Sequence, residues 1–347
     1  MRTNEITCPK SMPLNSSSPL SSTPDSKPPL TIILAAPRGF CAGVDRAIQI
    51  VAIALQRYGA PIYVRHEIVH NRHVVNRLAE HGAVFVDTLN EVPDGGRVVF
   101  SAHGVPKSVP EEARARGLFF VDATCPLVFK VHMEAMRHHE AGRHVILIGH
   151  AGHPEVIGTV GHLPEGAITL IEESTTVAQL PFKASDSLAY ITQTTLSVDD
   201  TAVIIDALQQ RFPHIAGPRR EDICYATSNR QNAVKHIAPQ VDVFVVAGSS
   251  NSSNAQRLVD VALQAGCTST YLVQDETNLN QDWFKNVKRI GLTSGASTPE
   301  IIVTDIIQKL REWFVINIDE QQITEETMRF KLPSILTQQV DADGRIH

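Results

Sequence analysis

The sequence lacks any run of about 18 apolar residues, the length that a membrane-spanning helix requires. Its first 29 residues are rich in serine and proline, and they also lack the apolar stretch of a secretory signal. We therefore expect no membrane helix, and we interpret the beginning of the chain as a disordered leader.

Cysteine is scarce, with five in 347 residues. An odd number dispersed along a long chain is unlike the dense disulfide framework of a small secreted domain, so a reducing cytoplasm is the expected compartment. No two cysteines form a close C-x-x-C pair, from which zinc sites usually draw two ligands. Cys8, in the leader, and Cys267, beside Gly266, have no distinctive setting and are interpreted as incidental.

Positive charge is in deficit, and the formal net charge is −6. Nucleic acid and anionic membranes would repel such a chain as a whole, so we expect general affinity for neither. A Walker-type Gly-Lys-Ser/Thr pattern and a Rossmann fingerprint are both missing, so nucleotide binding has no support.

The sequence does contain a regular alternation of short β-branched runs and helical patterns, which is typical of stacked βα units with a parallel sheet. Strands are expected at residues 31–35, 97–101, 118–121, 144–148, 188–192, 241–247 and 270–273. Helices are expected at residues 44–58, 72–81, 126–141, 199–211, 255–265 and 299–314. The predicted class is α/β.

Three cysteines recur in similar settings: Cys41, Cys125 and Cys224 each follow a strand-like run and precede a helix-like one. Their separations, 84 and 99 residues, suit units of about 90–100 residues. Ligands gather at the carboxyl ends of parallel strands, so three such connections can face one crevice. We therefore expect three similar α/β sub-domains with mostly parallel sheets around a shared site. The expected divisions are a leader at 1–29, lobes at 30–122, 123–221 and 222–314, and a C-terminal tail at 315–347 that packs back.

An isolated cysteine is usually a small buried hydrophobe. These three are placed where loops present functional groups and where a helix N-terminus favours the thiolate that binds metal. Three thiolates leave a fourth position open, either on zinc or on a cubane of iron and sulfide, and an open position indicates chemistry. The wide sequence spacing favours the cluster.

Residues 248–254 (GSSNSSN) follow a strongly apolar strand and open a helix, an arrangement that binds anions through hydroxyls, backbone N–H groups and the helix dipole. The candidates there are Ser252, Ser253 and Asn254. Ser297, just before a second helix start, can also present a hydroxyl. His70 and His103 lie at the ends of probable strands, where protonated imidazoles could neutralise a diphosphate. For residues 248–254, the alternative interpretation is a polar loop that only caps the following helix.

Glu155 is the candidate proton donor, because a carboxyl group in a partly dry crevice has a raised pKa. His153 stands two residues before it. Thr194 and Thr195 follow another strand and could relay the proton or hold a substrate hydroxyl. Taken singly, such a polar residue is more often a loop stabiliser than a catalyst.

Six segments, in order along the chain, closely resemble the 4-hydroxy-3-methylbut-2-enyl diphosphate reductase family. They are residues 39–44 (GFCAGV), 102–104 (AHG), 123–126 (ATCP), 152–155 (GHPE), 193–195 (QTT) and 251–254 (NSSN). The resemblance runs from about residue 31 to residue 333, and only the leader and the last residues fall outside it.

The resemblance implies three lobes arranged pseudo-threefold around one [4Fe–4S] cluster, held by Cys41, Cys125 and Cys224, with the fourth iron open. It implies reduction of the allylic hydroxylated diphosphate to isopentenyl and dimethylallyl diphosphates, the last step of the non-mevalonate isoprenoid pathway. It also implies Glu155 as proton source, with Thr194 and His153 in its relay. The implied diphosphate contacts are His70, His103, Ser252, Ser253, Asn254 and Ser297. Ferredoxin or flavodoxin is the implied electron donor.

Two other functions fit part of the pattern. A zinc-dependent diphosphate hydrolase would use a cysteine-ligated metal with Glu155 as general base. A non-catalytic iron–sulfur sensor would keep the cysteines but would need neither Glu155 nor the serine-rich anion loop.

Overall fold

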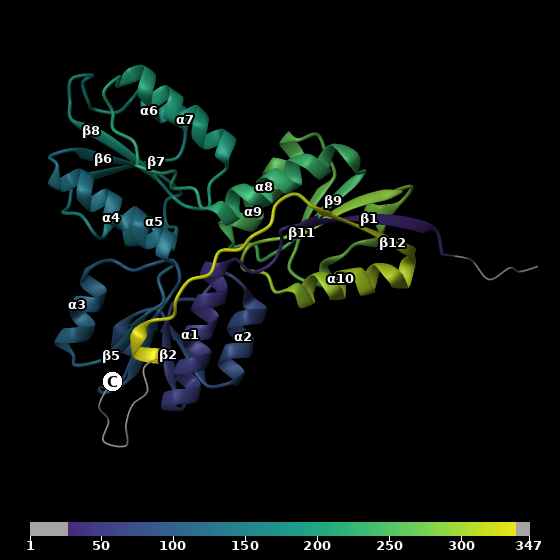
Figure 1. Ribbon diagram of the computed structural model, residues 1–347, viewed down its shortest axis with the longest axis horizontal. Helices are drawn as coiled ribbons and strands as arrows, with labels where there is room; N and C mark the ends of the chain where they lie inside the picture. The colour runs from purple at the N-terminus through teal and green to yellow at the C-terminus, as the bar shows by residue number, and fades with distance from the viewer. Residues whose placement is uncertain (1–26, 338–347) are drawn as a thin grey trace, which may run out of the picture.

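The computed structural model describes residues 27–337, which form three lobes, each built on a sheet whose neighbouring strands all run parallel (Figure 1). This confirms the predicted α/β class with three sub-domains. The leader up to residue 26 and residues 338–347 lie outside the described residues, so the expectations for them are untested. No helix within residues 27–337 is long and apolar enough to cross a membrane.

The first lobe has the strand order β3-β2-β4-β5, with β2 at Ile62–Arg65, β3 at Ala83–Val86, β4 at Arg97–Phe100 and β5 at Phe119–Asp122. Its helices are α1 (Ala42–Tyr58), α2 (Arg72–Glu80) and α3 (Ser108–Ala115), with a 3₁₀ turn at Leu89–Glu91. The second lobe has the order β7-β6-β8, with β6 at His144–Ile148, β7 at Ile168–Ile171 and β8 at Leu188–Thr192. Its helices are α4 (Pro126–Glu140), α5 (Pro154–Val160), α6 (Ser174–Val177) and α7 (Val198–Arg211).

The third lobe has the order β10-β9-β11-β1-β12, with β1 at Pro29–Ala36, β9 at Val243–Ala247, β10 at Thr270–Val273, β11 at Arg289–Ser294 and β12 at Val315–Gln322. Its helices are α8 (Tyr225–Ile237), α9 (Ser253–Gln264) and α10 (Glu300–Trp313), with 3₁₀ turns at Ala238–Gln240, Glu276–Asn278 and Gln281–Phe284. Beyond β12 the chain crosses to the first lobe, where α11 (Ser334–Thr337) lies against α1 (Figure 1).

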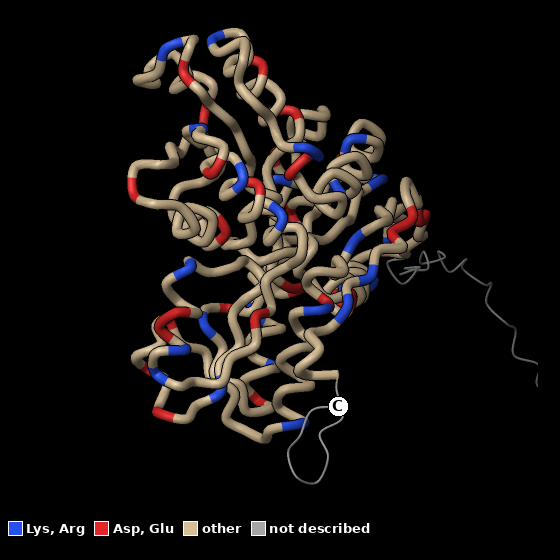
Figure 2. Tube along the Cα trace, turned by 60° about the vertical axis from the view of Figure 1, so that its left-hand side comes forward, with Lys and Arg blue, Asp and Glu red and all other residues tan. Residues whose placement is uncertain are grey.

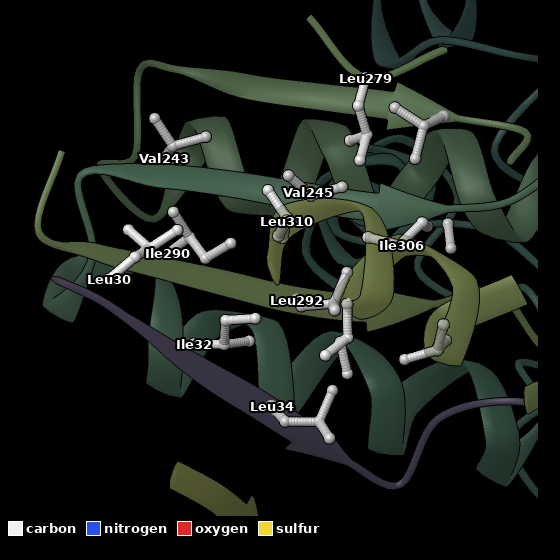
Figure 3. Packing of buried hydrophobic residues seen from close by; sticks show 14 of the residues in the cluster. Leu30, Ile32, Leu34, Val243, Val245, Leu279, Ile290, Leu292, Ile306 and Leu310 are labelled. Atoms are coloured by element: carbon white, nitrogen blue, oxygen red, sulfur yellow. The ribbon is translucent and has the colours of Figure 1, made fainter. Parts of the chain in front are cut away.

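The predicted lobe boundaries are wrong at both ends. Strand β1, expected in the first lobe, lies between β11 and β12 in the third sheet. Leu30, Ile32 and Leu34 face α10 on one side of this sheet (Figure 3). Ile33 and Ala35 face α8 and α9 on the other side. A strand that is apolar on both faces needs helices on both faces, and this sheet provides them.

The segment predicted as a tail begins with a strand. β12 pairs with β1 over eight residues at the edge of the third sheet. Its second half is polar and mostly exposed, so it carries no apolar alternation that sequence reasoning could detect. Acidic and basic residues are interspersed over all three lobes (Figure 2).

Candidate functional site

Three of the connections between lobes each carry one of the predicted cysteines. Cys41 joins β1 of the third lobe to α1 of the first, Cys125 joins β5 to α4 of the second, and Cys224 leads into α8 of the third. All three occupy the N-cap position of the helix that follows, where the helix dipole favours a thiolate. The three connections meet, and all three cysteines line one cavity of about 100 Å³.

The sulfur atoms of Cys41 and Cys125 lie close together across Gly43. A Cβ atom built on Gly43 would be 2.7 Å from Sγ of Cys125 and 3.8 Å from Sγ of Cys41. Burial, reinforced by the neighbouring Cys41, raises the pKa of Cys125 to about 12 and that of Cys224 to about 11. These clustered thiols therefore need a cation before they can be held together as thiolates.

Within residues 27–337, no group of three or more His, Cys, Asp or Glu side chains is spaced to hold one metal. Thiolates on one zinc ion would converge to about 2.3 Å from a common point. Thiolates on different irons of a cluster have no such requirement.

If the three cysteines hold the expected iron–sulfur cluster, Gly43→Ala should remove most of its iron. An added methyl group would contact Sγ of Cys125 at 2.7 Å, which forces the thiol out of its place. Iron content after anaerobic purification is the measurement, and melting of the metal-free chain is the internal control. Alanine normally stabilises a helix by roughly 0.5–1 kcal/mol relative to glycine. A more stable variant with normal iron would therefore contradict the expectation.

All the predicted site residues line this same cavity, and they come from all three lobes. They are Cys41, His70, His103, Cys125, His153, Glu155, Thr194, Thr195, Cys224, Ser252, Ser253, Asn254 and Ser297. Residues up to about 250 positions apart in the sequence therefore meet at one cavity. No local sequence pattern could establish this.

Three histidines form one edge of the cavity. The rings of His70 and His103 stack at 4.1 Å between centroids, and His153 lies 5.6 Å from His70 and 6.0 Å from His103. Burial lowers the pKa of His103 well below its usual range and lowers that of His153 to about 4. In the ligand-free protein both rings are therefore neutral near pH 7, whereas a protonated imidazole was predicted at His103 beside a bound diphosphate.

Several polar groups in the cavity are buried without a partner among the described residues. They are both side-chain atoms of Asn254, Nε2 of His70 and Nδ1 of His103. Ser252 caps α9, its hydroxyl accepting from the backbone N–H of Ala255. The hydroxyl of Ser297 donates to the carbonyl of His70 at 2.9 Å. Buried groups without partners cost free energy, so this edge is prepared for a polar ligand.

Glu155 is 3% exposed and lies in the first turn of α5. Its carboxylate accepts from the backbone N–H of Thr194 at 2.7 Å and from the Thr194 hydroxyl at 2.8 Å. Burial nevertheless raises the pKa of Glu155 to about 7, and the two hydrogen bonds offset only part of this effect. Nδ1 of His153 accepts from the backbone N–H of Glu155 and so caps the same helix.

Two contributions were not anticipated from the sequence. Thr227, fully buried, places its hydroxyl 3.1 Å from Sγ of Cys224. Thr227 stands three residues after the N-cap Cys224, a position from which a contact with the capping side chain could have been predicted. Gln193 donates to the hydroxyls of Thr195 and Ser253, joining the second lobe to the third. It lies in the segment 193–195, where the sequence suggests roles only for Thr194 and Thr195.

The model of the LytB protein family matches residues 32–311. The chain belongs to this family. Its relatives include proteins named 4-hydroxy-3-methylbut-2-enyl diphosphate reductase from Phenylobacterium zucineum, 58% identical over 90% of this chain and 99% of the relative, and from Hyphomonas neptunium, 57% identical over 90% and 99%. These findings confirm the resemblance read from the six segments.

Two solved structures of LytB-type reductases are similar as well. The E-1-hydroxy-2-methyl-but-2-enyl-4-diphosphate reductase from Plasmodium falciparum has a TM-score of 0.85 and 39% identity, covering 89% of this chain and 98% of that one. A second, described as (E)-4-hydroxy-3-methyl-but-2-enyl diphosphate reductase, the terminal enzyme of the non-mevalonate pathway, has a TM-score of 0.59 and 32% identity, covering 82% and 99%.

Proposed function

We propose that this chain reductively removes the hydroxyl group of (E)-4-hydroxy-3-methylbut-2-enyl diphosphate, giving isopentenyl and dimethylallyl diphosphates. The reaction consumes two electrons and two protons and releases water. The observation that carries the proposal is the convergence of three N-cap cysteines, a buried acid and unpartnered polar groups on one cavity. The names of the close relatives agree with it.

The proposed cofactor is one [4Fe–4S] cluster on Cys41, Cys125 and Cys224, with one iron open to substrate. The donor set fits, because three soft sulfur ligands come from three helix N-termini and no fourth cysteine lines the cavity among the described residues. When bound, the cluster supplies electrons and a Lewis-acidic iron for the hydroxyl oxygen.

We assign the diphosphate to the edge formed by His70, His103, Asn254 and the serines Ser252, Ser253 and Ser297. Support comes from the unpartnered atoms there and from the N-terminus of α9, which directs backbone N–H groups and a positive dipole end at an anion. A bound diphosphate also favours protonation of neighbouring imidazoles, so binding is expected to take up protons near pH 7.

Glu155 is assigned as the proton donor. A carboxyl group with a pKa of about 7 is half protonated at neutral pH, and its hydrogen bonds to Thr194 fix its orientation. Thr195 and His153 are assigned to the surrounding relay, since both line the same cavity.

We further propose that electrons come from a small one-electron carrier protein of the ferredoxin or flavodoxin kind, in a reducing cytoplasm. The four cysteines within residues 27–337 are unpaired thiols, as that compartment maintains them. Neither the hydrolase nor the sensor alternative is supported, because the named relatives are reductases.

The deciding experiment is anaerobic purification followed by a single-turnover assay with the hydroxylated diphosphate and a reduced artificial donor. A brown protein with about four irons and four sulfides per chain, yielding both product isomers, is the expected result. A colourless protein that carries one zinc ion and releases phosphate would overturn the proposal.

We expect Asn254→Asp to weaken substrate binding. The new carboxylate would repel the diphosphate and would lose the amide donor. Hydrogen bonds to charged groups contribute about 1.5–3 kcal/mol, so KM should rise by at least roughly tenfold. Steady-state kinetics with the artificial donor is the measurement, and Asn317→Asp, on the exposed edge strand β12 outside the cavity, is the matched control. Equal KM values in the two variants would remove Asn254 from the diphosphate site.

A further inference from the structure

The chain beyond β12 connects the third lobe to the first. We name residues 323–337 the strap. It ends at α11, beside the first lobe (Figure 1). There Leu336 is 6% exposed and packs in the core of the first lobe. Ile335, beside it, accepts a hydrogen bond from Arg57 of α1 through its backbone carbonyl. The strap contributes no residue to the cysteine-lined cavity.

One strap residue binds an arginine that reaches two of the cysteine loops. Arg230, in the helix that Cys224 caps, is fully buried. Its guanidinium donates to both carboxylate oxygens of Glu326, at 2.9 and 3.3 Å, and its Nη2 also donates to the carbonyl of Gly39 at 2.8 Å. Gly39 lies two residues before Cys41. The guanidinium therefore links the strap, the helix of Cys224 and the loop of Cys41.

A second arginine repeats this arrangement at the third cysteine. Arg46 lies in α1, the helix that Cys41 caps. Its Nε donates to the carbonyl of Lys331 in the strap at 2.8 Å. Its Nη1 donates to the carbonyls of Ala123 and Thr124, at 3.3 and 3.1 Å. Thr124 is the residue directly before Cys125, so this arginine links the strap, the helix of Cys41 and the loop of Cys125.

We propose that the strap, Arg230 and Arg46 act together as a clamp that holds the three cysteine loops in register for the cluster. The inference rests on the proposed iron–sulfur function. Arg230, Glu326 and Arg46 are positioning residues, because each acts on the cysteines through backbone carbonyls.

A buried arginine requires partners for its charge and its N–H groups. A buried guanidinium without its carboxylate is an uncompensated charge, and it moves toward water or another partner. If Glu326 is neutralised, the guanidinium of Arg230 loses its ion pair and is no longer held beside Gly39. The carbonyl of Gly39 then loses a charge-assisted hydrogen bond. Backbone hydrogen bonds also hold each loop, from Cys41 to Ala296, from Cys125 to Ala102 and from Cys224 to Thr194. The two arginines add charge-assisted links between the strap and these loops, so the rate of cluster loss should depend on the strap.

The test compares Glu326→Gln with Glu325→Gln, which removes the same charge from the exposed neighbouring side chain. Two measurements are made. Hydrogen exchange of the metal-free chain reports local opening at residues 39–44, and the rate of iron loss to a chelator reports on the loaded protein. We expect both rates to rise about tenfold or more in Glu326→Gln, with exchange in β6 unchanged. A purely structural role would raise exchange in β6 as well.

Arg46→Lys is the second variant, which also decides the matter if Glu326→Gln does not accumulate. Lysine keeps the charge, but one ammonium cannot replace a planar fork that binds the strap and a loop at once. Faster exchange at residues 123–127 and faster iron loss are expected. Rates equal to those of Glu325→Gln in both variants would overturn the clamp. If the unaltered chain binds no iron, the proposed function fails, whereas the exchange comparison still tests the clamp.

Discussion

Replacing Cys41, Cys125 or Cys224 by serine is expected to lower turnover with a reduced artificial donor by more than about 100-fold. Changes to groups that merely orient metal ligands already cost about 10–100-fold, and these thiols are the proposed ligands themselves. A serine hydroxyl is a harder donor with a much higher pKa, so it does not replace a thiolate on iron. Iron content and turnover are measured on the same anaerobic preparation.

The matched control for these variants is Cys267→Ser. Cys267 is also a free thiol, 2% exposed, but it packs in the core of the third lobe away from the cavity. Its variant should keep full iron content and activity even if it melts earlier. Normal turnover in any of the three cavity variants would show that the convergence of the cysteines is unrelated to catalysis.

Glu155→Gln is expected to lower kcat by about 10²–10⁴-fold, the usual contribution of a positioned proton donor. Glutamine keeps the shape of the side chain and can still accept from the backbone N–H of Thr194. The cluster should therefore remain, with normal iron content. Glu172→Gln, at a half-exposed carboxylate outside the cavity, is the control. Unchanged kcat in Glu155→Gln would exclude this carboxyl group as the proton source.

The pH dependence of the unaltered enzyme should follow the same group. Burial raises the pKa of Glu155 from the ordinary 4.5 to about 7, so the proton-donating form is lost as pH rises through about 7, and kcat should fall there.

The free energy of unfolding should also fall as pH rises. Between about pH 4.5 and 7 the unfolded chain gains from ionising this carboxyl while the folded chain does not, so the free energy of unfolding declines across this window.

Glu155→Gln removes that contribution, so its stability should be less sensitive to pH. Unfolding of the metal-free proteins in urea at pH 5 and pH 8 measures the difference. If both proteins lost the same free energy of unfolding between these pH values, the pKa of Glu155 would not be raised by its burial.

The local elements were predictable because their signals are short-range. All the strands and helices predicted from apolar spacing are present, with bounds that differ by a few residues. The strands β2, β3, β7, β11 and β12 were missed, as were the helices α3, α5, α6, α8 and α11. Helix α8 carries the polar run from Thr227 to Asn232, whose buried members face other polar groups instead of an apolar core. A pattern of apolar spacing cannot reveal such a helix.

By itself the sequence determined the α/β class, the three cysteine-bearing connections and the polar segments of the site. Each of these depends on residues that are neighbours along the chain. Only the tertiary structure decided that β1 belongs to the third sheet, that His103 and His153 are neutral, and that Arg230 and Arg46 tie the strap to the cysteine loops. Burial, sheet partnership and ion pairing depend on which distant segments come together, and a single sequence contains no local signal for that.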